Sequence, residues 1–569
     1  MVKTDIDYES VPGTSLLVDV NHNLTPEEAA ETEQGIVLIP TPSDDPNDPL
    51  NWSKPRKLMA VFCLIVYVFA GSIPGCCIYS ILTDIAADES VHMTVGKLNA
   101  GTGYMFLFLG LGNLILLPLA EQYGKRPVYL VSILADLMFN LWQPYTKSNG
   151  EWIASRILTG FFYAPIESLP EITITDLFFE HERATYMGIY GAALFSSNYA
   201  APMLAGFVND SLGWKWTIWI AVIFGSVCFL FMCVFMEETN YTRRIRVKRG
   251  LDGDVLTAYT SHGQEIKDPN LVTVKSNLDS ADEKGLKGVT SNTHIGNQAA
   301  LIEEDEIVEY PPVRTFIQRM SLTHGIKKEQ HLWDYFKAAF LMAQFPVVLY
   351  GGFLYGSSLF WYSVLNATEA MVLGAEPYNF KPSMCGLAYL SPVIFTFIIY
   401  PYAGWSTDWI KIKIAKKHHG HSQAEDRLWV LIVYMILGPF ALILWGVGAA
   451  KGVHWFGVVF GLGLLAGLCV VGCVSSVTYI LDTYHEMGSG ALVCAIIIRN
   501  SMNFGMDYAI TPFVTNVGLQ NCFVASAFIC FFCIGTFFIM ILTGKHWRTK
   551  MGKKYWKIVE EYRSKGLIS

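Results

Sequence analysis

Charged residues are scarce in this chain. Asp, Glu, Lys and Arg together make up 16% of the 569 residues, whereas a soluble domain usually carries about 25%. Hydrophobic residues make up 52%. This composition argues against a soluble protein, and the abundance of apolar residues excludes disorder as the dominant state.

Several functional signatures are also missing. The formal net charge is -8, and no basic domain stands out, so we expect no nucleic-acid partner. The sequence has no Gly-x-x-x-x-Gly-Lys-Ser/Thr loop, which argues against an ATP-driven pump. No catalytic motif stands in an apolar run, so we expect no enzyme. The twelve cysteines lie in or beside apolar runs, where Cys packs as a small hydrophobic residue, and we expect no metal and no cofactor.

Long uncharged runs fill the rest of the chain. Ten of them suit helices that cross a bilayer of about 30 Å, which takes about 20 residues. The run Tyr508–Gly544 is too long for one crossing and contains a turn at Asn516–Asn521. Two further spans carry charges, namely Trp152–Thr175 and a segment from Gly488 to Thr515. We therefore expect an all-α membrane protein with twelve transmembrane helices.

The hydrophilic blocks divide these spans into two bundles of six. We expect a cytoplasmic disordered tail at 1–57, six helices at 58–236, a cytoplasmic linker at 237–337, six helices at 338–544 and a tail at 545–569. Lys and Arg concentrate on the side of both termini, which places the termini inside. The sequon Asn366-Ala-Thr368 then falls in an outside loop, where Asn366 is a candidate for glycosylation.

The two halves carry similar segments at the inner ends of their second helices. The first has Glu121 followed by Gly124, Lys125 and Arg126, and the second has Asp408 followed by basic residues. An acid at this position can pair with a base, hold two helices together in one conformation and release them in the other. We interpret these residues as a conformational latch.

These residues carry a resemblance to the major facilitator superfamily. Glu121, Gly124, Lys125 and Arg126 resemble its signature loop, with Leu117 in place of the leading Gly. Its fold, two six-helix bundles, matches the expected organisation. Arg156-Ile-Leu-Thr-Gly160 is similar to the span-four motif, whose Arg the family links to proton coupling.

Shorter motifs narrow the resemblance to the fungal drug:proton-antiporter-type branch. They stand before the first span and after the fourth and sixth. Within that branch, Val37-Leu-Ile-Pro40 and the following Asp48-Pro-Leu-Asn-Trp52 run resemble the histidinol and polyamine permease subgroup. The resemblance implies proton-coupled movement of small organic cations across the plasma membrane. Ala201–Gly206 is similar to the antiporter signature, but two of its glycines are Ala, which favours import over antiport.

Charges inside the spans indicate where cargo and protons bind. A charge at the bilayer centre costs about 2.5–3.5 kcal/mol on insertion scales. At 100° per residue, Arg156, Glu167 and Glu171 lie on one stripe of their span, which we expect to face the central cavity. Glu167 and Glu171 are candidate cation ligands, and Arg156, Glu167 and Asp136 are candidates for proton coupling. Each also has a structural alternative, a polar contact or, for Asp136, a hydrogen bond between helices.

The remaining candidates come from other spans. Asn503 and Asp507 share a face with Arg499, and the three serve either the cavity or a clamp between helices. Tyr355 and Tyr362 offer aromatic faces to a cation, and Asn198 is a polar candidate. They are equally compatible with packing.

Three classes of function compete at this stage. The first is a proton-coupled transporter of polyamine- or histidinol-like cations, and the second is a multidrug:proton antiporter that exports xenobiotics. The third is a nutrient sensor that keeps the transporter fold and moves nothing. We expect a monomer whose partners are the cargo, protons and the lipid bilayer.

Overall fold

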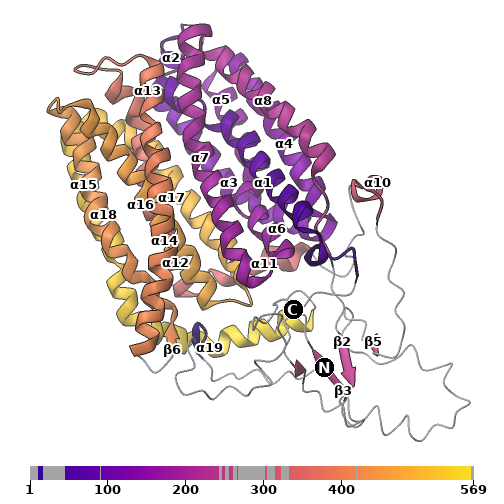
Figure 1. The fold of residues 1–569 in the computed structure, drawn as a ribbon. Coiled ribbons are helices and arrows are strands. Elements are labelled where there is room, and N and C mark those ends of the chain that lie inside the picture. The colour runs from indigo at the N-terminus through magenta and orange to yellow at the C-terminus, as the bar shows by residue number, and fades with distance from the viewer. Residues whose placement is uncertain are drawn as a thin grey trace, which may run out of the picture.

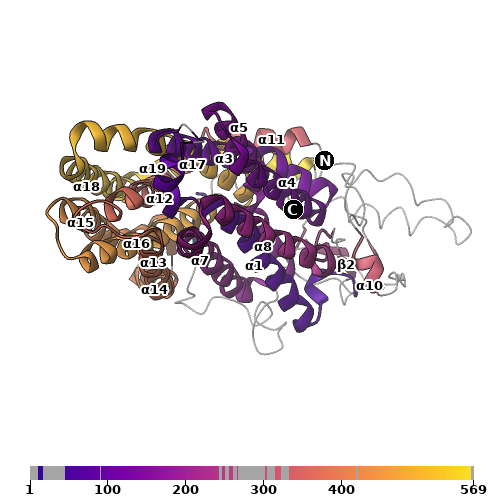
Figure 2. The same cartoon turned by 90° about the horizontal axis from the view of Figure 1, so that it is seen from above.

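Two helical bundles stand side by side in the computed structural model (Figures 1 and 2). The structure describes residues 11–16, 45–89, 91, 93–241, 246–249, 256–259, 265–266, 302–303, 314–321, 332–417 and 421–565. We call the face on which α8 ends and α12 begins the linker side, at the bottom of Figure 1, and the opposite face the far side.

The first bundle comes from the N-terminal half of the chain. A 3-10 turn, η1 (Pro49–Asn51), precedes it. Its elements are α1 (Lys54–Cys76), η2 (Tyr79–Ile81), α2 (Leu82–Ala87), α3 (Val95–Tyr123), α4 (Lys125–Trp142), η3 (Gln143–Tyr145), α5 (Asn149–Tyr163), η4 (Ala164–Glu167), α6 (Leu169–Leu177), α7 (Glu180–Leu212) and α8 (Trp214–Phe235).

The second bundle follows the linker. Described linker elements are β2 (Arg246–Arg249), β3 (Leu256–Tyr259), β4 (Glu265–Ile266), β5 (Ile302–Glu303) and α10 (Phe316–Arg319). The bundle has α11 (Leu332–Met342), α12 (Pro346–Leu373), α13 (Pro382–Ala388), α14 (Leu390–Lys417), η5 (Ala424–Val430), α15 (Leu431–Ala450), α16 (Trp455–Thr483), α17 (Gly488–Val517), α18 (Leu519–Gly535) and α19 (Phe537–Ser564).

Apolar length alone identifies only part of the membrane crossings. In the described part of the chain, seven helices are long and apolar enough to span, or eight if α11 and α12 form one bent span. The helix α5 has 15 residues, and α4 carries Lys125, Arg126 and Asp136. The count of twelve therefore stays a prediction.

Glycine turns of the same kind occur in the two halves of the chain. Gly213 joins α7 to α8 with a φ of 87°, and Gly518 joins α17 to α18 with a φ of 85°. Residues that carry a Cβ atom rarely adopt a positive φ, whereas glycine adopts it without steric cost. The turn expected within Tyr508–Gly544 is thus confirmed at Gly518.

The two bundles meet along a seam between α3 and α17. Gly96, Gly103 and Gly110, seven residues apart, lie against α17. A Cβ atom added to each would lie within 3.1–3.3 Å of Thr511, Phe504 and Asn500 respectively. Small residues let two backbones approach closely, which is how helices associate where no water drives them together.

A second contact between the bundles lies on the far side, between α7 and α13. A Cβ atom at Gly206 would lie 2.2 Å from the carbonyl oxygen of Pro382, and one at Gly386 would lie 2.8 Å from that of Pro202. Asn99 adds a polar link, because its amide donates to the carbonyl of Ala367 at 3.3 Å. The far-side ends of the bundles are therefore closely packed.

Two segments expected in the disordered tail have defined structure. The strand β1 (Thr14–Leu16) pairs with β6 (His421–Gln423), and η1 packs before α1. Arg548 of α19 donates to the carbonyl of Pro12 at 2.6 Å and pairs with the buried Glu425. The helix α19 runs beneath the bundles on the linker side (Figure 1), so the expected boundary at 544/545 falls inside a helix.

The start of α12 corrects the interpretation of Asn366. The sequence suggested one span at Ala338–Thr368, but the chain bends by 85° between α11 and α12. The helix α12 begins at Pro346, and its 28 residues reach Leu373. Asn366 consequently lies inside α12 and is 8% exposed, whereas glycosylation needs a surface loop. The expected outside loop at Asn366 is wrong.

Replacing Gly206 by Ala tests the far-side contact. We expect Gly206→Ala to destabilise this conformation by about 1–3 kcal/mol, the usual cost of overpacking, because the new methyl group meets backbone rather than a movable side chain. The measurement is the thermal unfolding midpoint of the purified protein in detergent. Gly404→Ala is the control, since no atom lies within 4 Å of its Cβ position. Equal midpoints for both variants would contradict the contact.

Candidate functional site

An ion pair joins the two bundles at the centre of the structure. Arg499 of α17 pairs with the carboxylate of Glu167 in η4, and the two side chains are only 7% and 11% exposed. The amide of Asn500 donates to the second oxygen of Glu167 at 3.2 Å. Sequence reasoning left open whether Arg499 serves the cavity or a clamp between helices, and in this conformation it holds Glu167 of the other half.

Breaks in the fourth span explain how Glu167 reaches the pair. Pro170 lacks the N–H that would bond to the carbonyl of Ile166, and the hydroxyl of Tyr190 donates to that carbonyl instead. Ser168 donates to Asn113 of α3 at 2.8 Å. The expected continuous stripe of Arg156, Glu167 and Glu171 is therefore interrupted, because η4 replaces a helical turn.

Tyr355 of α12 completes the surroundings of Arg499. Its hydroxyl accepts a hydrogen bond from the guanidinium at 2.9 Å, and the guanidinium carbon lies 4.8 Å from the ring centroid. Arg499 also donates to the side-chain oxygen of Asn500 at 2.8 Å. A positive charge is thus held by a carboxylate, an amide and an aromatic face, all of which suit an organic ammonium group equally well.

Glu171 lies one turn beyond Glu167, in α6. Its side chain is half-buried, and the charges of Glu167 and Arg499 both act on it. Within the described residues it forms no hydrogen bond and no ion pair. Glu171 is therefore a carboxyl group available to a ligand beside the pair that joins the halves.

A second set of charges lies toward the far side. Arg156 is fully buried and donates to the carbonyl of Gly75 and to Thr102, both at 3.3–3.4 Å. It acts electrostatically on Asp507 of α17, although no ion pair within 4.0 Å joins them among the described residues. One oxygen of Asp507 and the side-chain oxygen of Asn503 are buried without a partner.

The other candidates have separate surroundings. Asp136 accepts from Asn140 of its own helix at 2.9 Å, so the bond to another helix that we considered is absent from the described contacts. Asn198 of α7 accepts from Cys76 at 3.4 Å. Tyr362 stacks edge-on against Tyr199 at 4.9 Å between ring centroids. These residues are not part of the Glu167 cluster.

The first latch segment forms a buried network at the linker side. Lys125 is 2% exposed and pairs with Asp176 of α6, while Glu121 lies 3.9 Å from its ammonium nitrogen. Arg126 donates to the carbonyls of Cys233 and Met320. The side chain of Asp408, the counterpart in the second half, lies outside the described residues.

Glu238, which follows α8, organises the same network. Its two oxygens accept the backbone N–H groups of Lys125 and Arg126 at 3.1 and 3.0 Å, which caps the N-terminus of α4. Burial raises its pKa, while these N–H groups act in the opposite direction. Gly124 has a φ of 121°, and a Cβ atom there would lie 2.6 Å from Glu238.

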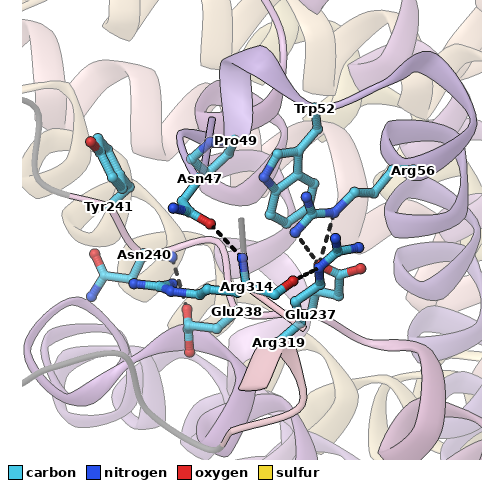
Figure 3. Close-up of a pocket in the computed structure, with 10 residues that line it drawn as sticks. All are labelled: Asn47, Pro49, Trp52, Arg56, Glu237, Glu238, Asn240, Tyr241, Arg314 and Arg319. Atoms are coloured by element: carbon cyan, nitrogen blue, oxygen red, sulfur yellow. Dashed lines mark hydrogen bonds and ion pairs between the residues drawn. The ribbon is translucent and has the colours of Figure 1, made fainter. Parts of the chain in front are cut away.

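A small pocket adjoins this network on the linker side (Figure 3). Arg56 pairs with Glu237 and stacks on Trp52, with the guanidinium carbon 3.8 Å from the ring centroid. The backbone N–H of Arg314 donates to Asn47 at 3.1 Å. The lining comes from the segments before α1, after α8 and around α10. The pocket therefore belongs to the linker-side end of one bundle and not to the interface between the halves.

Sequence reasoning missed several of these partners. Asp176 and Glu238 come from elements distant in sequence from the latch segment, and no local spacing identifies them. The expected span Ala338–Thr368 ended just before Glu369, whereas the structure places Glu369 inside α12 and fully buried. The one signal in the sequence is that Glu369 stands 23 residues after Pro346, the first proline of the span.

The fold and these motifs agree with comparisons against known proteins. A family model described as Major Facilitator Superfamily matches residues 59–506. The chain therefore belongs to the major facilitator superfamily, a family of multi-pass membrane transporters for small molecules. Members are generally transporters and not enzymes.

Fungal relatives match over nearly the whole chain. An uncharacterised MFS-type transporter of Schizosaccharomyces pombe is 28% identical, covering 96% of this chain and 94% of its own length. Protein HOL1 of Saccharomyces cerevisiae is 26% identical and covers 92% of each chain. MFS antiporter QDR3 of Candida albicans is 23% identical, covering 85% of this chain and 76% of its own.

A solved structure supports the fold. The xylose transporter XylE from E. coli, in a partially occluded inward-open conformation, has a TM-score of 0.53 and 11% sequence identity. The match covers 86% of this chain and 98% of that chain. The membrane fold expected from sequence is thus confirmed.

Removing the buried ammonium of Lys125 tests the latch network. We expect Lys125→Met to destabilise the protein by about 1–3 kcal/mol, because it removes the cation that the partly exposed carboxylates of Glu121 and Asp176 contact. Breaking a fully buried ion pair costs more, about 3–5 kcal/mol of stability. Thermal unfolding in detergent measures the loss. Lys97→Met is the control, because Lys97 is exposed. The network would have no structural role if both variants unfolded at the same temperature.

Proposed function

We propose that this protein is a secondary active transporter of small organic cations, polyamine- or histidinol-like, coupled to protons across the plasma membrane. Both termini and the linker are then cytoplasmic. The observation that carries the proposal is Glu171, an available carboxyl group beside the ion pair between the two halves. A mid-membrane position at the interface of two repeats is where transporter cargo sites lie.

The arrangement suggests how cargo changes the contact between the halves. An ammonium group that reaches Glu171 also competes with Arg499 for Glu167, because both cations need the same carboxylate. The cargo thereby weakens the pair that holds the halves in this conformation. A ligand shifts a conformational equilibrium only through such a difference in contacts.

Proton coupling follows from the same carboxyl group. A half-buried carboxyl that holds a proton while empty releases it when a cation binds beside it, since the cation favours the ionised form. Binding of cargo and release of a proton are then linked reciprocally. Import driven by the inward proton gradient requires the proton to travel with the cargo, so the released proton is held by another buried carboxyl, Asp136 or Asp507, on both of which Arg156 acts.

A multidrug:proton antiporter is the second candidate. The similarity to MFS antiporter QDR3 favours it, and the same acidic and aromatic groups accept cationic drugs. The Ala residues in the segment Ala201–Gly206 favour import.

Uptake of labelled spermidine at external pH 5 and pH 8 tests the proposal. We expect faster uptake at pH 5, because the inward proton gradient is then steeper. Glu171→Gln should slow uptake at least about tenfold, since a charge-assisted contact contributes about 1.5–3 kcal/mol. Surface expression is measured in parallel.

Glu376→Gln is the matched control, because it makes the same change at an exposed position and should leave uptake unchanged. Uptake of normal rate in Glu171→Gln would exclude Glu171 from the cargo site. If spermidine is not taken up but a cationic dye accumulates less than in empty cells, the antiporter replaces the importer. Absence of both fluxes overturns transport of organic cations and favours a sensor.

A further inference from the structure

Glu369 is a fully buried carboxyl group. It lies in the last turn of α12 and is 0% exposed, and neither of its oxygens has a hydrogen-bond partner among the residues that the structure describes. No cation among the described groups acts on it electrostatically. An ionised carboxylate costs a large free energy in such surroundings unless a positive charge compensates it. The C-terminal end of a helix adds to that cost for an anion.

Other buried oxygen atoms near this carboxyl also have no hydrogen-bond partner in the described part of the chain. Its charge acts on Tyr362 and Tyr389, and the hydroxyl oxygens of both tyrosines are buried without a partner. The side-chain oxygen of Asn366, one turn earlier in α12, is also unpaired. Native proteins pair nearly all buried polar atoms, so this concentration of unpaired buried oxygen atoms is unusual.

These residues form one stripe with the central site. Tyr355, Tyr362, Asn366 and Glu369 lie within about 60° of one another around α12, at 100° per residue. Tyr355 contacts Arg499, and Glu369 lies about 21 Å further along the axis toward the far side. One small cation therefore does not reach Tyr355 and Glu369 together.

We propose that Glu369, Tyr362 and Tyr389 form a second binding site, for a primary ammonium group of the cargo on its way to or from the far side. An ammonium group supplies three N–H donors, which the Glu369 carboxylate and the hydroxyl oxygens of the two tyrosines accept. The aromatic rings of Tyr362 and Tyr199 suit its alkyl chain and its charge. The proposal rests on the proposed function in one respect, namely that the cargo is an amine.

Putrescine binding to the full chain in lipid nanodiscs tests the second site. The native chain should bind two molecules, and Glu369→Gln should bind one, with the far-side site weakened at least about tenfold. Tyr389→Phe, which removes only the hydroxyl, should weaken the same site less. Glu376→Gln again serves as the control and should keep both sites.

Thermal unfolding separates binding from folding. Because Glu369→Gln removes a buried charge without a partner, its unfolding midpoint without putrescine should equal or exceed that of the native chain. A lowered midpoint with unchanged binding of two molecules would overturn the proposal and make Glu369 structural. Sodium chloride at equal ionic strength should not raise the unfolding midpoint as putrescine does. An equal rise with sodium would overturn the ammonium site in favour of a metal-ion site.

The two proposals fail independently. In the Glu171→Gln chain, the far-side site should remain as the single putrescine site, and Glu171→Gln with Glu369→Gln should bind none. If Glu171→Gln binds two putrescine molecules and Glu369→Gln binds one, the result would contradict the central cargo site and support the far-side site. Two sites in Glu369→Gln would overturn the far-side site, whatever the spermidine uptake of the native chain shows about transport.

Discussion

The pair between Glu167 and Arg499 is the interaction on which the arrangement of the two halves depends. It joins η4 of one bundle to α17 of the other, at a depth where neither charge is tolerated alone. Breaking such a pair by removing one partner leaves an uncompensated charge, whereas exchanging one partner for another of the same charge does not. A cation that enters between the halves is therefore able to take over the role of Arg499.

Other contacts in the structure explain how replacing Arg499 by a cation at Glu167 would change the conformation. The glycine positions on α3 and at Gly206 and Gly386 keep the bundles in backbone contact on the far side, without large side chains that would have to repack. The network of Lys125, Asp176 and Glu238 holds the linker-side ends of one bundle together. The first bundle is thus held together at its linker-side end, while the Glu167–Arg499 pair and the glycine contacts join it to the second bundle.

The sequence predicted the helical membrane fold well and the partners of individual residues poorly. Uncharged runs and glycine turns are local properties, so the helices and the turn at Gly518 follow from them directly. Glu167 and Arg499 were both visible as intramembrane charges, but which of several charges pair depends on how helices 332 residues apart in sequence pack. Asp176 and Glu238 were not predicted as partners for the same reason. Glu369 was not predicted, because the break before Pro346, and not hydropathy, determines where α12 begins and ends.

The most direct test of the account is the affinity for spermidine when each member of the central pair is neutralised separately. If cargo and Arg499 compete for Glu167, Arg499→Gln should bind spermidine more tightly than the native chain, since the carboxylate is then free. Glu167→Gln should bind it more weakly. Opposite shifts in equilibrium Kd, measured on folded protein in nanodiscs, are the predicted result. Equal weakening in both variants, or no change in either, would contradict exchange and make the pair a fixed structural clamp.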